Sequence, residues 1–296
     1  MMKGRLGLET ARVPQTDRHG LLWLAFGRLY VEAGTLRFVC AAGGLYEAGD
    51  YAIPFQMLSC ILLAPGTIVT HDAIRLLARH GTGLVAVGDD GVRFYASMPF
   101  GPDDSARARR QVRAWADPEG KLNVAKTMYR WRLGEEITGS SLNQLRGLEG
   151  ARMRETYKLL AQKFNIQWRG RRYDRKNPSD TDDPNMAINH AATAVQAAAM
   201  IAVAVSGCIP QLGFIHEDSG RAFALDIADL HRDTITLPAA FSAVHRARKS
   251  RQPLERVTRK LVGEILKKKN TIPRMIDQIK ELIDVDDHRR DPKRSG

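Results

Sequence analysis

The chain has 296 residues, of which 44% are hydrophobic and 26% charged, values typical of a soluble globular protein and not of a disordered one. Its net charge is +12, most of it after Arg246, which favours a polyanionic partner, with nucleic acid ahead of a membrane surface. A basic protein without such a partner would have the same composition.

The cysteines and the apolar runs predict a cytoplasmic protein without a membrane span. Cys40, Cys60 and Cys208 lie far apart without metal-ligand spacing, which indicates reduced thiols. The N-terminal residues contain no apolar signal core. The most apolar run, residues 191–209, is alanine-rich and interrupted by polar residues, so it favours a buried helix.

The first hundred residues predict a β-rich domain. Short apolar or alternating runs, separated by glycine-containing turns, predict strands at residues 21–31, 35–40, 57–64, 83–88 and 91–97. The turn residues at 33–35 and 89–91 fit hairpins. One helix is expected at 71–80, where Thr70 can cap the start and Gly81 can end it.

The composition changes after a segment that combines proline, glycine and paired acids, and helical spacing dominates from there. Helices are predicted near residues 105–116, 120–137, 142–166, 184–206, 221–232, 238–249, 253–268 and 272–283. The fold class is therefore α+β. We expect an N-terminal β-rich domain (1–98), a linker (99–106), a larger all-α catalytic domain (107–283) and a disordered tail (284–296).

A carboxylate interrupts the apolar face of the helix predicted at 142–166. Glu149 falls in the middle of that face, where a carboxylate needs a cationic partner. A structural pair with a neighbouring arginine would satisfy it. However, Gly147 and Gly150 flank the acid and leave room for a ligand or another backbone, which favours a functional site.

A second polar cluster follows the alanine-rich helix. Asp226 and Asp229 are three residues apart, hence on one face of the next predicted helix, and His216 precedes them. Two like charges on one face repel unless Arg221, Arg232 or a metal ion lies beside them. One imidazole with two or three carboxylates suits Mn²⁺, or Mg²⁺ with water ligands, better than zinc. The spacing alone fits ordinary pairing better than metal binding.

Several motifs in order resemble one known family, the CRISPR adaptation integrase, most closely its type I-E subtype. The likeness lies in RGLEGARMRETY, GFIH, LDIADLHR, NIQWRGRRYD, DPNMAIN and LAPGTIVTHDAIRLLARHGTGLVAVGDDGVRFYAS. It covers roughly residues 17–240. The resemblance implies a metal-dependent DNA endonuclease and integrase that inserts new spacers into CRISPR arrays, with a β-rich N-terminal domain and a helical C-terminal domain.

The resemblance also implies site residues and partners. Glu149, His216 and Asp229 fall on the metal ligands, for Mg²⁺ or Mn²⁺, and Asp226 falls on a further acidic position needed for catalysis. Six basic residues fall on positions that resemble DNA contacts: Arg75, Arg93, Arg146, Arg154, Arg171 and Arg232. The implied partners are double-stranded DNA, a second copy of the chain in a homodimer, and a small ferredoxin-fold companion protein. The companion forms a dimer, and two of the homodimers flank it.

The sequence departs from the family at some positions. Gln196 and Phe26 stand where relatives have tyrosine or another aromatic residue, which excludes a tyrosine nucleophile there and favours a metal mechanism. Ile68 replaces an arginine that faces DNA. The tail differs in length and composition, so recognition of the motif beside the spacer is expected to differ.

The expected reaction is attack of a DNA 3′-hydroxyl on a phosphodiester, which exchanges one phosphodiester for another and needs no ATP. Two alternatives remain open on the residues alone. A metal-dependent nuclease that cuts branched DNA would use the same site with water as the attacking group. A non-enzymatic DNA-binding scaffold would instead keep Glu149 and Asp229 paired with arginines.

Overall fold

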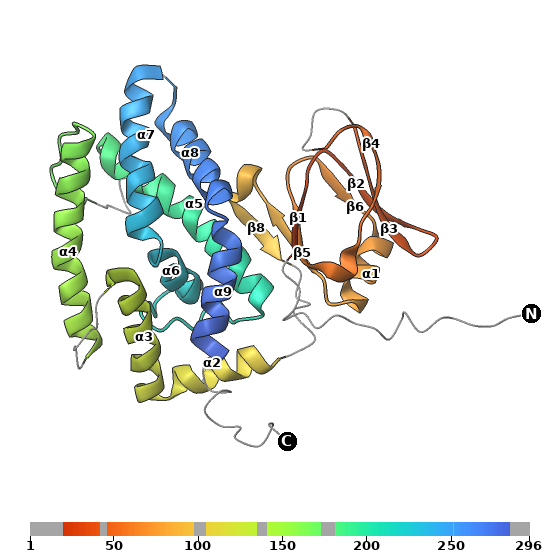
Figure 1. The fold of residues 1–296 in the computed structure, drawn as a ribbon, viewed down its shortest axis with the longest axis horizontal. Coiled ribbons are helices and arrows are strands. Elements are labelled where there is room, and N and C mark those ends of the chain that lie inside the picture. The colour runs from red at the N-terminus through yellow and green to blue at the C-terminus, as the bar shows by residue number, and fades with distance from the viewer. Residues whose placement is uncertain are drawn as a thin grey trace, which may run out of the picture. The chain divides into compact units, whose positions relative to one another are not determined.

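The computed structural model describes residues 20–41, 46–97, 105–134, 141–172, 181–250 and 252–284. Strands come first and helices follow, which confirms the predicted α+β class (Figure 1). The chain divides into two compact units. One takes the residues up to 89 together with 95–105, and the other takes 90–94 and the residues from 106 onward. The segment 90–94 thus belongs to the helical unit. Most of the predicted linker and of the predicted tail lies outside the described residues.

The N-terminal unit contains two four-stranded sheets, with strand orders β1-β5-β7-β8 and β4-β3-β2-β6. The strands are β1 (Gly20–Leu24), β2 (Gly27–Glu32), β3 (Thr35–Cys40), β4 (Gly49–Ala52), β5 (Leu58–Leu63), β6 (Thr67–Val69), β7 (Gly83–Val87) and β8 (Phe94–Ser97). In the first sheet β1, β5 and β7 are parallel. In the second, β3 pairs antiparallel with β2 and β4, and β6 pairs parallel with β2.

The turn and cap signals in this unit behave as the sequence predicts, but the run at 21–31 is not one strand. It divides into β1 and β2, which belong to different sheets, and Phe26 between them has a φ of 53°. Ala33 and Gly34, with φ of 48° and 78°, form the two-residue turn of the β2–β3 hairpin. A 3₁₀ turn at Asp89–Gly91 occupies the second expected turn. The Thr70 side chain accepts a hydrogen bond from the Ala73 backbone and caps α1 (His71–Arg79). The buried face of α1 packs on the core of the second sheet, which includes Leu29 and Phe38.

The helical unit contains every helix that the sequence predicts, with small shifts at the ends. They are α2 (Ala106–Ala116), α3 (Pro118–Leu133), α4 (Leu142–Lys163), α5 (Asp183–Ser206), α6 (Ala222–Asp229), α7 (Leu237–Ser250), α8 (Leu254–Lys268) and α9 (Thr271–Asp284). The helix expected at 221–232 ends earlier, and a π-helical turn, η5 (Arg232–Thr236), leads into α7.

Helix α5 forms the centre of this unit and contacts α6, α7, α8 and α9 (Figure 1). Its small alanine side chains allow those neighbours to approach closely. Asp182 caps its start and Pro184 lies in its first turn, while Gly207, with φ of 68°, ends it. By length and composition alone α5 could cross a membrane, but 61% of its most apolar stretch is buried inside the protein, as in a core helix.

Candidate active site

Asp226 of α6 organises the loop that carries His216. The backbone N–H groups of Phe214, Ile215 and His216 donate to its carboxylate at 2.6, 3.1 and 2.9 Å. The carboxylate is 2.7 Å from Nδ1 of His216 as well. Asp226 itself is only 1% exposed, so the three N–H groups offset the cost of burying its charge. This loop geometry therefore depends on one carboxylate.

Glycine is required where the loop begins. A Cβ atom on Gly213 would lie 2.3 Å from the carbonyl oxygen of His216 and 2.8 Å from Ala222. Such distances are far below van der Waals contact, and two of the three opposing atoms belong to the backbone. The GFIH sequence therefore combines a close backbone approach with the imidazole that follows it.

The contact with Asp226 orients the His216 ring. With Nδ1–H donating to the carboxylate, Nε2 is left as the free nitrogen, and it lies 3.7 Å from Oδ2 of Asp229. The hydrogen bond to Asp226 raises the pKa of His216, against the effect of burial, and the nearby Asp229 acts in the same direction. A carboxylate behind a histidine is the usual way to orient a metal-ligating imidazole.

Asp229 lies at the end of α6 beside two arginines. Oδ1 of Asp229 is 3.4 Å from Nη1 of Arg232, whose Nη2 donates to the Tyr157 hydroxyl at 3.1 Å. Burial raises the pKa of Asp229, while Arg232 and Arg132 act to lower it. Of the cations that the spacing suggested, Arg232 is the one that contacts this carboxylate.

Glu149 of α4 is held by residues of α3. Tyr129 donates its hydroxyl to Oε2 at 3.1 Å, and the Arg132 guanidinium contacts Oε1. Arg132 also reaches Asp233 at 3.3 Å, and its side chain is only 4% exposed. Burial and the adjacent Glu149 raise the pKa of Tyr129. The predicted arginine partner thus exists, but it comes from another helix.

The arginines next to Glu149 in sequence have other roles. Arg146 donates to the carbonyl oxygen of Ile215 at 2.6 Å and so ties α4 to the loop that carries His216. Arg152 donates to the carbonyl oxygen of Leu133 at 2.9 Å. Arg132 could not be predicted from neighbours along one helix, because it lies on α3, 17 residues before Glu149. A cation three residues after a tyrosine in TMYRWRL was the available signal.

The surface beside Glu149 is open. A Cβ atom on Gly147 would meet nothing within 4 Å, and one on Gly150 would meet only the Arg154 guanidinium at 4.0 Å. No other backbone approaches these glycines in the described part of the chain. The sequence left two explanations for these glycines, close approach of a ligand or of another backbone. The open space fits approach of a ligand better.

The metal ligands that the resemblance implies lie close together but are not drawn into one cluster. Glu149 acts electrostatically on both His216 and Asp229. Among the described residues, however, no group of three or more histidine, cysteine or acidic side chains is close enough to hold an ion as the side chains stand. One imidazole, two carboxylates and an orienting Asp226 still form a donor set that suits Mg²⁺ or Mn²⁺.

The six predicted DNA-contacting arginines are distributed over the chain. Arg146 and Arg232 lie at the site, and Arg154 lies on the exposed side of α4. Arg75, on α1 of the N-terminal unit, pairs with Asp72.

The other two arginines are held by polar neighbours. Arg93 lies 3.4 Å from Glu255. Arg171 donates to the side-chain oxygens of Asn185 and Asn189 at 2.9 and 2.6 Å. Their part in DNA binding stays a prediction.

Comparison with known proteins identifies the family. The family described as CRISPR associated protein Cas1 matches residues 130–270, a segment that contains Glu149, His216, Asp226 and Asp229. CRISPR-associated endonuclease Cas1 2 of Thermus thermophilus is 35% identical over 277 residues, with 90% of this chain and 84% of the relative covered. The chain belongs to the Cas1 family.

Further relatives agree. CRISPR-associated endonuclease Cas1 of Escherichia coli K12 is 34% identical, with 92% of this chain and 87% of the relative covered. The crystal structure of the TtCas1–DNA complex superposes with a TM-score of 0.81 at 33% identity, over 92% of this chain and 99% of that one. These comparisons confirm the predicted family and the prediction that the protein is a CRISPR-associated nuclease. The type I-E subtype stays a prediction.

Proposed function

We propose that this member of the Cas1 family joins short DNA fragments to a CRISPR array at the site of Glu149, His216 and Asp229. The reaction would be a transesterification, in which a DNA 3′-hydroxyl attacks a phosphodiester and displaces another DNA 3′-oxygen. The observation that carries the proposal is the fixed His216 ring, whose Nε2 faces Asp229 at 3.7 Å while Asp226 holds Nδ1. Such an arrangement presents a nitrogen and a carboxylate oxygen to one ligand.

Glu149, His216 and Asp229 would together hold Mg²⁺ or Mn²⁺. When bound, the ion would supply Lewis-acid polarisation of the target phosphodiester and help to activate the attacking hydroxyl. Arg132 now neutralises Glu149, so Glu149 would exchange that contact for the ion. Asp226 would act as a positioning residue, because the hydrogen bonds of its carboxylate among the described residues run to the 214–216 segment.

The basic residues would neutralise the DNA. An acidic site repels a polyanion unless cations lie around it, and Arg146 and Arg232 lie beside these carboxylates. The net charge of +12 supports the same partner, as does the DNA-bound relative with a TM-score of 0.81. We further propose that the protein forms a homodimer and that two such homodimers flank a dimer of a small ferredoxin-fold companion protein. The proposed location is the cytoplasm.

A strand-transfer assay tests the proposal. Short duplexes labelled at their 5′-ends, with free 3′-hydroxyls, are incubated with a plasmid that carries a CRISPR array, with Mg²⁺ or Mn²⁺ present. Glu149→Ala should abolish transfer of label while DNA affinity stays within about threefold of the native protein. Glu155→Gln, an exposed change on the same helix, is the matched control and should be active. Retained transfer by Glu149→Ala would remove Glu149 from the reaction.

The same assay separates integration from simple cutting. A nuclease for branched DNA would cleave a labelled fork at the same metal-dependent site but would leave the plasmid unlabelled. Transfer of label to the plasmid therefore supports the integrase. Cleavage of the fork without transfer would support the nuclease, because water would then be the attacking group.

A further inference from the structure

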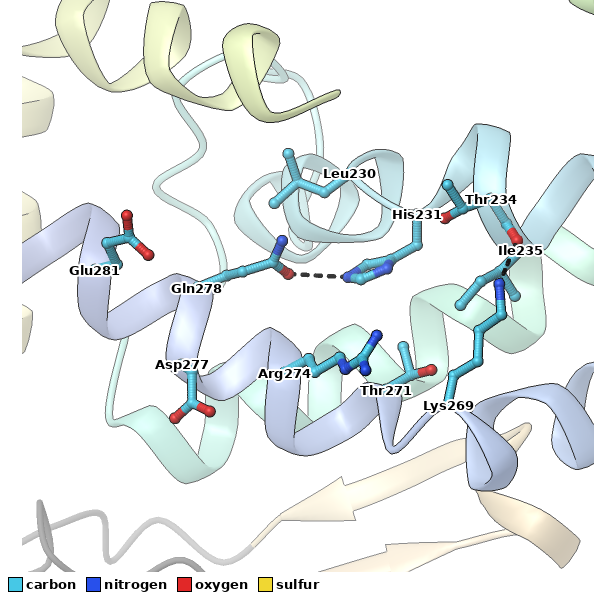
Figure 2. Close-up of a pocket in the computed structure, with 10 residues that line it drawn as sticks. All are labelled: Leu230, His231, Thr234, Ile235, Lys269, Thr271, Arg274, Asp277, Gln278 and Glu281. Carbon is cyan, nitrogen blue, oxygen red and sulfur yellow. Dashed lines mark hydrogen bonds between the residues drawn. The ribbon is translucent and has the colours of Figure 1, made fainter. Parts of the chain in front are cut away.

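A pocket of about 550 Å³ lies between the end of α6, the π-helical turn η5 and helix α9 (Figure 2). None of the four candidate active-site residues lines it. Its volume is in the range of small-molecule sites and suits a single nucleotide unit. The pocket is lined by Leu230, His231, Thr234, Ile235, Lys269, Thr271, Arg274, Asp277, Gln278 and Glu281.

One end of this pocket holds two cations without acidic partners. Lys269 donates to the carbonyl oxygen of Thr234 at 3.0 Å, but within the described ranges neither Lys269 nor Arg274 forms an ion pair. Both lower the pKa of His231, together with its burial, so both are close to that ring.

A buried hydroxyl at the same end has no partner. Thr271 is the first residue of α9 and is 1% exposed, and its Oγ1 makes no hydrogen bond in the part of the chain that is described. Figure 2 shows its side chain at the pocket wall between Lys269 and Arg274. Buried hydroxyl groups nearly always find a partner, so this one indicates a ligand or an ordered water.

The charges along α9 run against its dipole. The first turn of the helix contains no acidic residue and instead carries Arg274, although the N-terminus of a helix favours negative charge. Measured along the helix axis from Thr271, Asp277 lies about 9 Å away and Glu281 about 15 Å away, at 1.5 Å per residue. The two cations of the pocket thus lie in the first turn of α9 and just before it, where an anion would relieve the repulsion.

We propose that this pocket binds a phosphate group at the start of α9. Lys269 and Arg274 neutralise it and the Thr271 hydroxyl donates a hydrogen bond to it, while the carboxylates of Asp277 and Glu281 exclude phosphate from the far end. The phosphate comes either from a DNA backbone or from a free nucleotide. The proposal goes beyond the integrase reaction and needs neither a metal nor the residues of the active site.

Two variants test the pocket in the full-length protein. Arg274→Gln removes an exposed charge, and Thr271→Val replaces the unpartnered hydroxyl by a methyl group of similar size, so both should fold. Lys268→Gln is the matched control, because Lys268 is exposed next to the pocket but does not line it. All measurements are made in EDTA, so that loss of the metal site cannot affect them.

Two arms distinguish the sources of the phosphate. Calorimetry with deoxyadenosine monophosphate should show binding that Arg274→Gln and Thr271→Val weaken about tenfold if the ligand is a free nucleotide. DNA binding measured against salt should lose about 0.9 from its log–log slope in Arg274→Gln, and nothing in Lys268→Gln, if it is a backbone phosphate. If the native protein binds no nucleotide and the two variants have equal slopes, the proposal is wrong.

Discussion

The imidazole of His216 and the carboxylate of Asp226 are joined at 2.7 Å, and the same carboxylate receives three backbone N–H groups from the loop that carries the imidazole. Ring and loop are therefore fixed by one buried side chain. The hydrogen bond to Asp226 therefore decides which nitrogen of the His216 ring faces Asp229.

Replacing Asp226 by Asn should damage both the fold and metal binding. The amide nitrogen would face N–H donors, so we expect a loss of about 2–3 kcal/mol in the free energy of unfolding. The misoriented His216 should weaken Mn²⁺ binding about 10–100-fold. Urea unfolding and a Mn²⁺ titration measure the two effects, with the exposed Asp218→Asn as control. Unchanged Mn²⁺ affinity would mean that Asp226 does not orient the ligand.

Arg132→Gln should make the melting temperature depend more strongly on added Mn²⁺. Removing the guanidinium leaves Glu149 and Asp233 without their buried cation, which should cost about 3 kcal/mol in EDTA. A divalent ion would restore a positive charge beside Glu149. The rise in melting temperature on adding Mn²⁺ should therefore be larger in the variant than in the native protein or in Arg130→Gln. An equal rise in all three would contradict exchange of Arg132 for the ion.

Gly147→Ala should separate stability from activity. Alanine replaces glycine inside α4 where the space is open, so the free energy of unfolding should increase by about 1 kcal/mol. If DNA or its phosphate approaches the bare helix beside Glu149, strand transfer should fall at least tenfold in the same variant. Ala151→Gly, exposed on the same helix, should do the reverse: lower stability and unchanged transfer.

His190 of α5 should contribute to acid sensitivity. Burial lowers its pKa, and Arg259 and Arg93 act in the same direction. Since its folded pKa is below the unfolded value of about 6.5, the unfolded state binds the proton more readily. The free energy of unfolding should therefore fall as the pH drops below about 6.5. His190→Gln should flatten this slope in a denaturant series over pH 5–7, and an unchanged slope would contradict the prediction.

Periodicity and capping predicted most of the fold because those signals are local. Each helix of the helical unit follows a run at helical spacing, and Thr70 and Pro184 mark helix starts as expected. Strands β4 and β6 were missed. GDYA at residues 49–52 and TIV at residues 67–69 are short, and they become strands only by pairing with β3 and β2.

The site could be predicted only in part. Glu149, His216 and Asp229 were noticeable because a charged or imidazole group in an apolar stretch requires a partner. Arg132 was not, since its two carboxylates lie 17 and 101 residues away along the chain. Contacts between helices of this kind are set by packing, and no spacing rule along one helix reaches them.

Helix α5 touches four other helices through its alanine surface. Widening one of those contacts would displace neighbours on several sides together, so partial loosening of the helical unit is unfavourable. Denaturant should therefore remove helical circular dichroism and strand transfer at one common midpoint. The enzyme would pass from active to inactive without a weakened form between.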